Sequence, residues 1–313
     1  MFDRITNPML INRNLMYIGK NMQNLQKTQE QISSGKMFRL PSDNPINATQ
    51  SMGLKNDVKR TEQYKHNIVN GVSFLENTSS VLSQIEDVLL EIKNIAQNAA
   101  SEITTSAERT AFGFEVNQLL EELLLSSNSK FNGKFIFGGT ETLSGTRANS
   151  APFNAVMSGN VIASVTQNPD GIGGEIKRLA GEGKAVIINV NGDDVFQPNG
   201  ENGTHDIFQT VIRLRENLNA NDSASIQDRI KELDREFEQV VSQNTLAGAK
   251  VNRLELMSDQ LDDLQIIQKE RLSELEDTDY AEAIMRLQSQ ETALQATLAA
   301  SSRILSQSLL DYI

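Results

Sequence analysis

The stretch ISSGKMFRLPSDNP, residues 32–45, interrupts a helical pattern and decides the architecture of the chain. Apolar residues recur at helical spacing on both sides of it, whereas the stretch itself holds a glycine, a basic cluster and two prolines. Gly35 is a natural helix C′ residue, because glycine adopts the left-handed conformation without steric cost. Asn44 can then cap a second helix, with Pro45 at the first position, where an N–H is not needed. We therefore expect one helix to end and another to begin within this stretch.

The two helices on either side of the break carry heptad seams. The first seam has alternating steps of four and three residues: Ile11, Leu15, Ile18, Met22, Leu25, Gln29 and Ile32. The second runs from Leu54 to Ala99, and a helix over 45–100 would be ~80 Å long at about 1.5 Å per residue. That length exceeds a single compact core, so the pattern predicts a long helical rod.

The second half of the chain mirrors the first. A capping box at Thr105 and Glu108 predicts a third helix, whose apolar residues are Ala111, Phe114, Leu119, Leu120, Leu123 and Leu124. Helix returns near residue 204, with an apolar face of Ile207, Phe208, Val211, Ile212 and Leu218. A long seam then runs from Ile226 to Leu275, and Thr278 or Asp279 is the expected cap of a last helix. Its seam is Ile284, Leu287, Glu291, Leu294, Leu298, Ser301, Leu305, Ser308 and Tyr312.

Between these helical halves, residues 131–203 differ from the rest of the chain in composition and in hydrophobic pattern. Glycine is frequent, and short apolar runs alternate with turn signals. VIASVT (161–166) and AVIINV (185–190) predict strands, and NPDGIGG and NGDD predict turns between strands. This segment is therefore expected to form a β-rich insert.

The predicted fold is mainly α, with long antiparallel helical rods that the N- and C-terminal halves form together and a small β-rich domain inserted in the middle. The halves must pair, because each rod alone exposes an apolar stripe, and burying one Leu contributes about 1.5–3 kcal/mol. The expected segments are an N-terminal coiled-coil block, two halves of a rod domain around the insert, and a C-terminal coiled-coil block. Their ranges are 1–44, 45–130, 131–203, 204–277 and 278–313.

Charge separates the terminal blocks from the rest of the chain. The whole protein has a net charge of −12, which argues against sequence-independent nucleic-acid binding. Residues 1–45 nevertheless carry six basic and three acidic residues, whereas residues 200–279 carry nine basic and eighteen acidic ones. The terminal seams also contain polar residues, so we expect these helices to be mobile in a monomer and to become ordered when copies pack together. An ordinary four-helix bundle with frayed ends is the alternative.

The predicted assembly residues follow from these seams. They are Ile11, Leu15, Ile18, Met22, Leu25, Ile32, Leu287, Leu294, Leu298 and Leu305, with Gly35, Asn44 and Pro45 as hinge and cap residues.

No catalytic, cofactor-binding or metal-ligating constellation is apparent in the sequence. The chain has no Cys and two histidines, His66 and His205, without metal-ligand spacing. GIGGE (171–175) lacks the third glycine of a dinucleotide motif, and GEGKA (181–185) lacks the first glycine and the Ser/Thr of a P-loop. No segment reaches the ~18 apolar residues of a membrane span, and the N-terminus lacks the apolar core of a secretory leader. An enzyme is therefore not expected.

Three motifs, in order, resemble the flagellin superfamily. ISSGKMFRLPSDNPINA resembles its N-terminal signature, with Asn44 in place of the usual second Asp. TLAGAKVNRLE (245–255) and the segment from DTDYAEA to SLLDYI (277–313) resemble its C-terminal elements. RITNPML, FNGKFIFGGT and the SLLDYI ending are more similar to the hook-associated members than to filament flagellins. The resemblance covers roughly residues 1–140 and 205–313.

The resemblance implies a structural subunit of the bacterial flagellum that joins hook to filament and polymerises through its terminal helices. It implies no cofactor, and an extracellular location reached by flagellar type III export without a cleaved leader. The implied partners are further copies of the chain, a second hook-associated protein, flagellin and an export chaperone, with neither nucleic acid nor membrane insertion. A filament flagellin is the alternative within the superfamily, and a cytoplasmic coiled-coil adaptor is the alternative outside it.

Overall fold

The structure, a computed structural model, describes residues 7–140, 151–168, 172–201, 203 and 205–310 of the chain. The chain divides into two compact units. Unit 1 contains the residues up to Arg60 and those from Asp263 onward, and unit 2 contains Thr61–Asp262. Two long helices, α2 (Pro45–Ala99) and α6 (Ser223–Glu276), contribute residues to both units. Segments from the two ends of the sequence therefore belong to one unit, as the mirrored seams predict.

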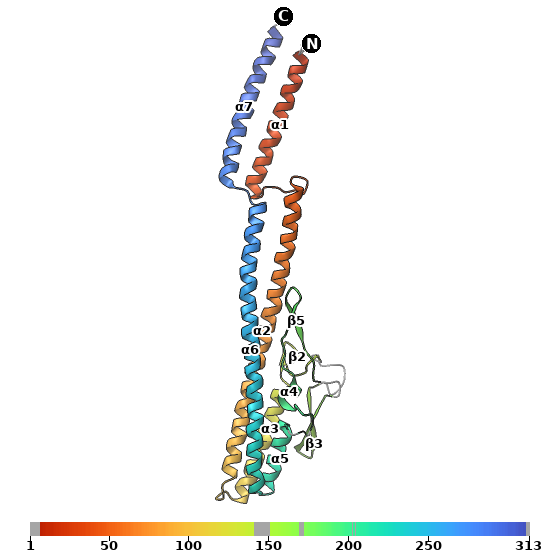
Figure 1. Ribbon diagram of the computed structural model, residues 1–313, viewed down its shortest axis with the longest axis vertical. Coiled ribbons are helices and arrows are strands. Elements are labelled where there is room, and N and C mark those ends of the chain that lie inside the picture. The colour runs from red at the N-terminus through yellow and green to blue at the C-terminus, as the bar shows by residue number, and fades with distance from the viewer. Residues whose placement is uncertain (1–6, 141–150, 169–171, 202, 204, 311–313) are drawn as a thin grey trace. The chain divides into compact units, whose positions relative to one another are not determined.

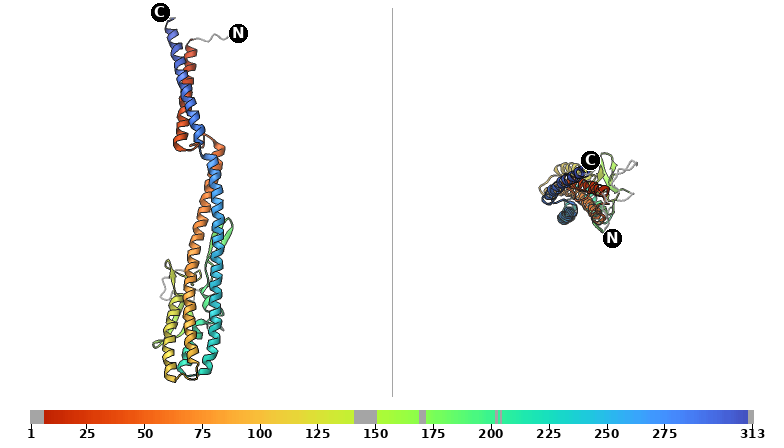
Figure 2. Two further views of the ribbon diagram at one scale, coloured as in Figure 1. Left: turned by 90° about the vertical axis from the view of Figure 1, so that its left-hand side faces the viewer. Right: turned by 90° about the horizontal axis from the view of Figure 1, so that it is seen from above.

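Unit 1 is built around two terminal helices, α1 (Asn7–Ser34) and α7 (Tyr280–Leu310). They lie side by side (Figure 1, Figure 2). The C-terminal end of α1 lies beside the start of α7, so the two helices are antiparallel. Asn21 Nδ2 donates a hydrogen bond of 3.1 Å to Thr297 Oγ1 across this contact.

In unit 2, α3 (Ser106–Ser127) and α5 (Ile207–Asn219) share a hydrophobic core with α2 and α6 (Figure 1). The capping box predicted at the start of α3 is confirmed: Thr105 Oγ1 accepts a hydrogen bond from Glu108 N, and Glu108 Oε2 accepts one from Thr105 N. The predicted seam of α2 is also confirmed, because Leu75, Leu82 and Leu89 are fully buried. Strong apolar periodicity therefore identifies the core face of this helix correctly.

Polar contacts between α2 and α6 show that these helices run antiparallel in unit 2. Residues farther along α2 contact residues nearer the start of α6. The contacts join Lys65 to Asp262, Ser79 to Asn244, and Lys93 to Asp234. The predicted fold class, mainly helical with antiparallel pairing of the two halves around a small β-rich insert, is confirmed.

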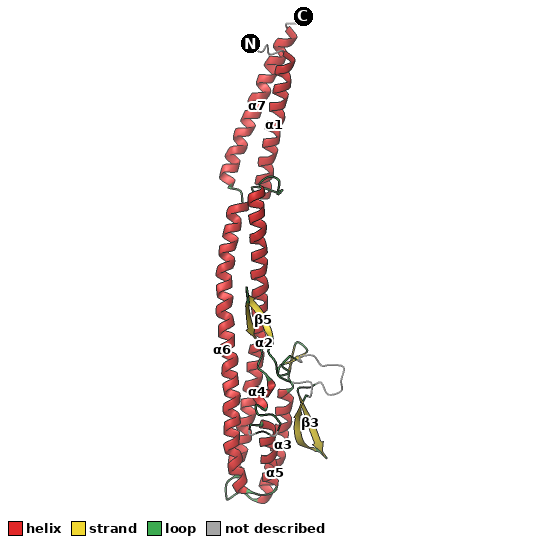
Figure 3. Cartoon of the chain, turned by 45° about the vertical axis from the view of Figure 1, so that its right-hand side comes forward, coloured by secondary structure: helices red, strands yellow, loops and turns green. Residues whose placement is uncertain are grey.

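The strands that the structure describes lie between α3 and α5 in the sequence and form two-stranded antiparallel hairpins (Figure 3). Their strands are β1 (Lys130–Phe131) with β2 (Lys134–Phe135), β3 (Phe153–Ser158) with β4 (Val161–Gln167), and β5 (Lys177–Gly181) with β6 (Lys184–Ile187). Asn132 and Gly133 connect β1 to β2 with φ values of 50° and 76°. Positive φ at both turn residues suits a type I′ turn, for which Asn-Gly is the preferred sequence.

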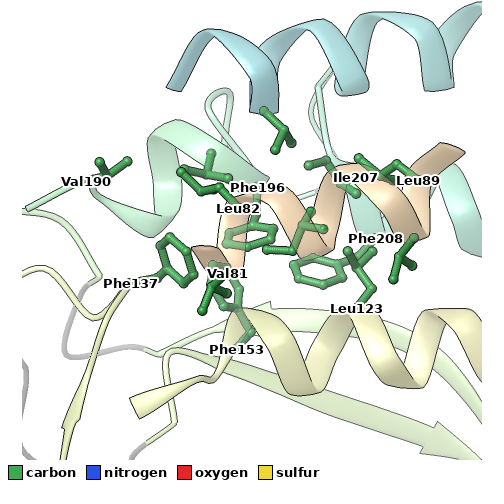
Figure 4. Packing of buried hydrophobic residues seen from close by; sticks show 14 of the residues in the cluster. Val81, Leu82, Leu89, Leu123, Phe137, Phe153, Val190, Phe196, Ile207 and Phe208 are labelled. Carbon is green, nitrogen blue, oxygen red and sulfur yellow. The ribbon is translucent and has the colours of Figure 1, made fainter. Parts of the chain in front are cut away.

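Four phenylalanines bind the insert to the helices (Figure 4). Phe137, Phe153 and Phe196 come from the insert, Phe208 comes from α5, and all four are fully buried. Ring centroids lie 5.2 Å apart for Phe137 and Phe196, 4.9 Å for Phe153 and Phe196, and 5.5 Å for Phe196 and Phe208. These separations are typical of favourable aromatic pairs. The insert therefore contributes to the same core as the helices.

Two predictions about local structure are wrong. NGDD does not form a turn between strands but begins a short helix, α4 (Gly192–Phe196), because Val195 and Phe196 must reach the core. The apolar face predicted for α3 is wrong at Phe114 and Ala111, which are exposed. Leu119, Leu120 and Leu123, which the sequence also predicts as apolar positions of this helix, are buried, whereas Phe114 and Ala111 lie on another side of it. The sequence of α3 is apolar on too many sides for periodicity to choose one.

Candidate assembly surface and corner of unit 1

The contact between α1 and α7 follows one heptad line on each helix. On α1 the covered positions are Ile11, Asn14, Ile18, Asn21, Leu25, Thr28 and Ile32. On α7 they are Ala283, Leu287, Gln290, Leu294, Thr297 and Ser301. Steps of three and four residues keep each line on one side of its helix. We call these two lines the inner seam.

The inner seam is too polar to form a strong coiled coil. Six of its thirteen members are Asn, Thr, Gln or Ser, and only Thr28, Ala283 and Ser301 are buried. The large apolar members remain partly exposed, so they gain only part of the burial energy available to a core residue. Polar residues at such positions specify register at a cost in stability. The pair is therefore specified by its sequence but weakly stabilised within one chain.

A second line of apolar residues lies beside the inner seam and is not covered. Leu15 is 60% exposed, Met22 58% and Leu298 48%, and Ile284 is exposed as well. Leu15 and Leu298 line the same groove, of about 220 Å³, together with seam residues. We call these four residues the open stripe. Apolar residues that gather along one side of a helix pair mark a surface suited to a further apolar partner.

The structure distributes the predicted assembly residues between these two lines. Six lie on the inner seam: Ile11, Ile18, Leu25, Ile32, Leu287 and Leu294. Leu15, Met22 and Leu298 lie on the open stripe, and the side chain of Leu305 is outside the described residues. Their role in assembly remains a prediction.

The predicted register of the terminal seams is wrong by one position in each heptad. The prediction placed Leu15 and Met22 on the same line as Ile11, whereas the structure directs Asn14 and Asn21 toward α7. Asn21 takes this place because its side-chain amide donates a hydrogen bond to Thr297 Oγ1 across the contact. The polar residue that recurs every seven positions, Asn14, Asn21 and Thr28, is the signal in the sequence that could have identified the inner seam.

At the end of α1, the chain turns a sharp corner in a conformation that favours glycine. Gly35 has φ of 68°, and a Cβ atom there would lie 2.8 Å from the Tyr280 hydroxyl oxygen. The Gly35 carbonyl accepts a hydrogen bond of 2.9 Å from Thr278 N, and Met37 N donates one of 2.6 Å to Glu276 O. The corner that follows α1 is thus tied by backbone hydrogen bonds to the segment that precedes α7.

Charged side chains reinforce this corner. Lys36 Nζ lies 2.7 Å from Asp277 Oδ1 and 3.3 Å from Glu276 Oε2, and Lys55 also pairs with the buried Glu276. The hydrogen bond with Asp277 raises the pKa of Lys36 and lowers the pKa of Asp277. Burial alone would raise the pKa of Glu276, but hydrogen bonds from Lys55, Ser51 and Lys36 outweigh it and hold that pKa below its usual value. Glu276 therefore stays ionised and links three segments of unit 1.

The helices that leave the corner have identifiable caps. Pro45 is the first residue of α2, and Asn44 Oδ1 accepts a hydrogen bond of 3.2 Å from Asn47 N. At the start of α7, Asp279 Oδ1 accepts a hydrogen bond of 2.8 Å from Ala281 N. Asp279 rather than Thr278 is therefore the cap of the last helix.

Unit 2 contains one buried carboxyl group with a strongly altered acidity. Burial, with Asp206 and Glu232 nearby, raises the pKa of Glu236 to about 8. Its Oε1 lies 3.9 Å from His205 Nδ1, and its Oε2 is buried without a hydrogen-bond partner. Among the residues that the structure describes, no group of three or more His, Asp or Glu is arranged to hold a metal ion. Likewise, none of the described helices is both long and apolar enough to cross a bilayer.

Known proteins match both helical ends of this chain. Residues 5–142 match the bacterial flagellin N-terminal helical region, and residues 230–313 match the bacterial flagellin C-terminal helical region. Flagellar hook-associated protein 3 of Salmonella typhimurium is 23% identical over 307 residues, which cover 94% of this chain and 94% of that protein. A flagellar filament 30.7 kDa core protein of Treponema maltophilum is 29% identical over 167 residues, which cover 51% of this chain and 56% of that protein.

A solved structure shares the fold. The crystal structure of flagellar hook associated protein-3 from Legionella pneumophila superposes with a TM-score of 0.62 at 17% sequence identity. The match covers 72% of this chain and 98% of that one.

Proposed function

The chain belongs to the bacterial flagellin family, and we propose that within this family it is a structural subunit of the junction between hook and filament, polymerising through its terminal helices. The observation that carries this proposal is the extent of similarity. The chain matches a hook-associated protein 3 along nearly its whole length, whereas it matches a filament core protein over about half. A junction subunit shares its helical ends with filament subunits but differs from them in the middle, which agrees with this pattern.

The terminal helices support polymerisation as the mechanism. Their inner seam is half polar, and the open stripe beside it leaves Leu15, Met22 and Leu298 exposed to solvent. Each of these side chains is about half exposed, so covering the rest of it would contribute about 1 kcal/mol, and every added copy would offer several of them. Packing between copies would therefore add to the stability that pairing within one chain gives these helices. The corner at Gly35 and Glu276 would hold the two helices in register before they are incorporated.

The proposed partners follow from the same role. Further copies of the chain would complete the open stripe, a second hook-associated protein would lie on the hook side, and flagellin would lie on the filament side. An export chaperone would cover the apolar terminal helices before assembly. The location is the extracellular part of the flagellum, and the role is structural rather than catalytic.

Deletion of the gene tests this proposal directly. We expect cells that make hooks but carry no filaments, with flagellin released into the medium, and we expect the wild-type gene to restore filaments. Normal filaments on the deletion strain would overturn the proposal.

A filament subunit is the second candidate, because filament proteins of the family also match the helical ends. Electron microscopy of the purified chain at high concentration separates the two. A junction subunit should form no long filaments alone, and extended filaments from this chain would favour the second candidate.

A further inference from the structure

The loop between α2 and α3 presents the most exposed large apolar side chain in the described part of the protein. Ile103 is 90% exposed, and its neighbour Glu102 is exposed as well. Glu102 takes part in no ion pair with any described residue. The exposed Ile103 side chain contributes little burial energy to the fold of its own chain, so it is available for contact with another molecule.

This loop is held firmly rather than loosely. The buried guanidinium of Arg109 donates hydrogen bonds of 2.9 Å to Ala99 O and to Ser101 O, and it also bonds Asn221 Oδ1. Thr104 Oγ1 donates a hydrogen bond of 2.9 Å to Asn98 O, near the end of α2. The capping box of α3 begins directly afterwards. The loop therefore holds Ile103 in a fixed, projecting position, which reduces the entropy lost when another molecule contacts this side chain.

The same unit has a cleft with complementary properties. A cleft of about 580 Å³ lies between α2, the β1–β2 hairpin and the strands β5 and β6. Its apolar lining is Phe74, Phe131, Ile176 and Ile188. This volume lies within the range of ligand pockets, so the cleft has room for more than one side chain of a partner loop.

The charge of the cleft is positive. Lys134 and Arg178 stand at its edge, and neither forms an ion pair or side-chain hydrogen bond with a described residue. Asn70 and Asn132 provide further hydrogen-bonding groups, and the described lining contains no carboxylate. The cleft is thus suited to an apolar side chain that has a carboxylate next to it.

We propose that Ile103 and Glu102 of one copy enter this cleft of a second copy. Ile103 would contact the apolar lining, and the Glu102 carboxylate would pair with Lys134 and Arg178. A chain cannot make this contact with itself, because about 25 residues of α2 separate Phe74 from the loop, or roughly 40 Å of helix. The contact joins two different surfaces, so it can repeat from copy to copy and close into a ring when the rotation between copies allows it. It deepens the proposed function, on which it rests for the assembly of copies, by naming a contact within unit 2.

Disulfide trapping tests the contact, because the natural chain has no cysteine. One full-length variant carries Ile103→Cys and a second carries Asn70→Cys, which is at the edge of the cleft on α2. We expect the mixture of the two to form a disulfide-linked heterodimer at least about tenfold faster than a matched mixture of Leu125→Cys with Asn70→Cys. Leu125 is 74% exposed on α3 and does not line the cleft, so it controls for random collision. Equal rates in the two mixtures would overturn the contact.

A charge exchange provides an independent test. Glu102→Arg in the copy that carries Ile103→Cys should slow the trapping, and Lys134→Glu with Arg178→Glu in the Asn70→Cys copy should restore it. No recovery would count against the assigned pairing, and circular dichroism of each variant would verify folding. Trapping that fails while the natural gene still restores filaments would reject the contact and leave the junction function standing. Trapping that succeeds while the deletion strain forms normal filaments would support the contact and reject the function.

Discussion

Replacement of Glu236 by glutamine should stabilise unit 2 at alkaline pH. The Glu236 side chain is 1% exposed, and its Oε2 has no hydrogen-bond partner. The charged and titratable groups that face it are Asp206 at the start of α5, Glu232 and Arg235 on α6, and His205 before α5. Two of these are carboxylates, and burial removes the water that would stabilise a further negative charge. A neutral glutamine of the same shape avoids both costs.

The size and sign of the effect follow from the pKa of Glu236. It rises from an ordinary 4.5 to about 8 in the fold, a difference worth roughly 5 kcal/mol between the two protonation states. Between these two pH values the unfolded chain has released the proton and the folded chain still binds it. The free energy of unfolding should therefore fall by about 1.4 kcal/mol for each pH unit across this window. The advantage of Glu236→Gln should be absent below pH ~4.5 and reach up to several kcal/mol at pH ~8.

Urea denaturation from pH 5 to 9 measures this difference, with hydrogen exchange of the α5 amides to assign the change to unit 2. Glu238→Gln is the matched control, because Glu238 is exposed on the same helix two residues away. We expect the curve of Glu236→Gln to diverge upward from that of the parent as pH rises, and the control curve to stay parallel to the parent. Parallel curves for Glu236→Gln and the parent would refute the assignment of a protonated, buried Glu236.

Three further predictions concern unit 1. Leu298→Asp should abolish incorporation of the chain into flagella, which filament counts measure. The melting temperature of the monomer should shift by less than a few degrees, because Leu298 is 48% exposed. Normal filaments would contradict this prediction. Gly35→Ala should lower the free energy of unfolding by about 1–2 kcal/mol because of the positive φ, and by more because the new Cβ would meet the Tyr280 hydroxyl. Adding Tyr280→Phe should remove only the loss due to that hydroxyl, which urea denaturation measures. Because the pKa of Glu276 lies below its usual value, its contribution to stability should be present above pH ~4.5 and be lost as pH falls through that lowered value. The stability of the matched variant Glu276→Gln should lack this dependence on pH. If the variant lost stability in acid as the parent does, the role assigned to the corner ion pairs would be rejected.

The rod helices were predictable because their sequences are strongly one-sided. Leu75, Leu82 and Leu89 recur at heptad spacing with mostly polar residues between them, so the apolar residues of this part of α2 gather on one face. The caps were predictable for a local reason, since Gly35, Asn44 and Thr105 act on backbone groups within a few residues. The predicted register of the terminal seams was wrong because each helix carries two adjacent lines of residues, one of mixed polarity and one more apolar. Periodicity selects the more apolar line, whereas Asn21 reached the contact through a partner more than two hundred residues away.

The candidate surfaces also have some features that the sequence determines and others that only the tertiary structure determines. The break at Gly35 and the polar residues within the terminal seams can be read from the sequence by itself. Only the tertiary structure decided which apolar residues stay uncovered, namely Leu15 and Leu298 on the terminal pair and Ile103 on its rigid loop. The physical reason is that exposure depends on what the rest of the chain covers. Local spacing determines where a helix begins, ends and turns its apolar face, but the side chains of distant segments determine whether that face is filled or left for another molecule.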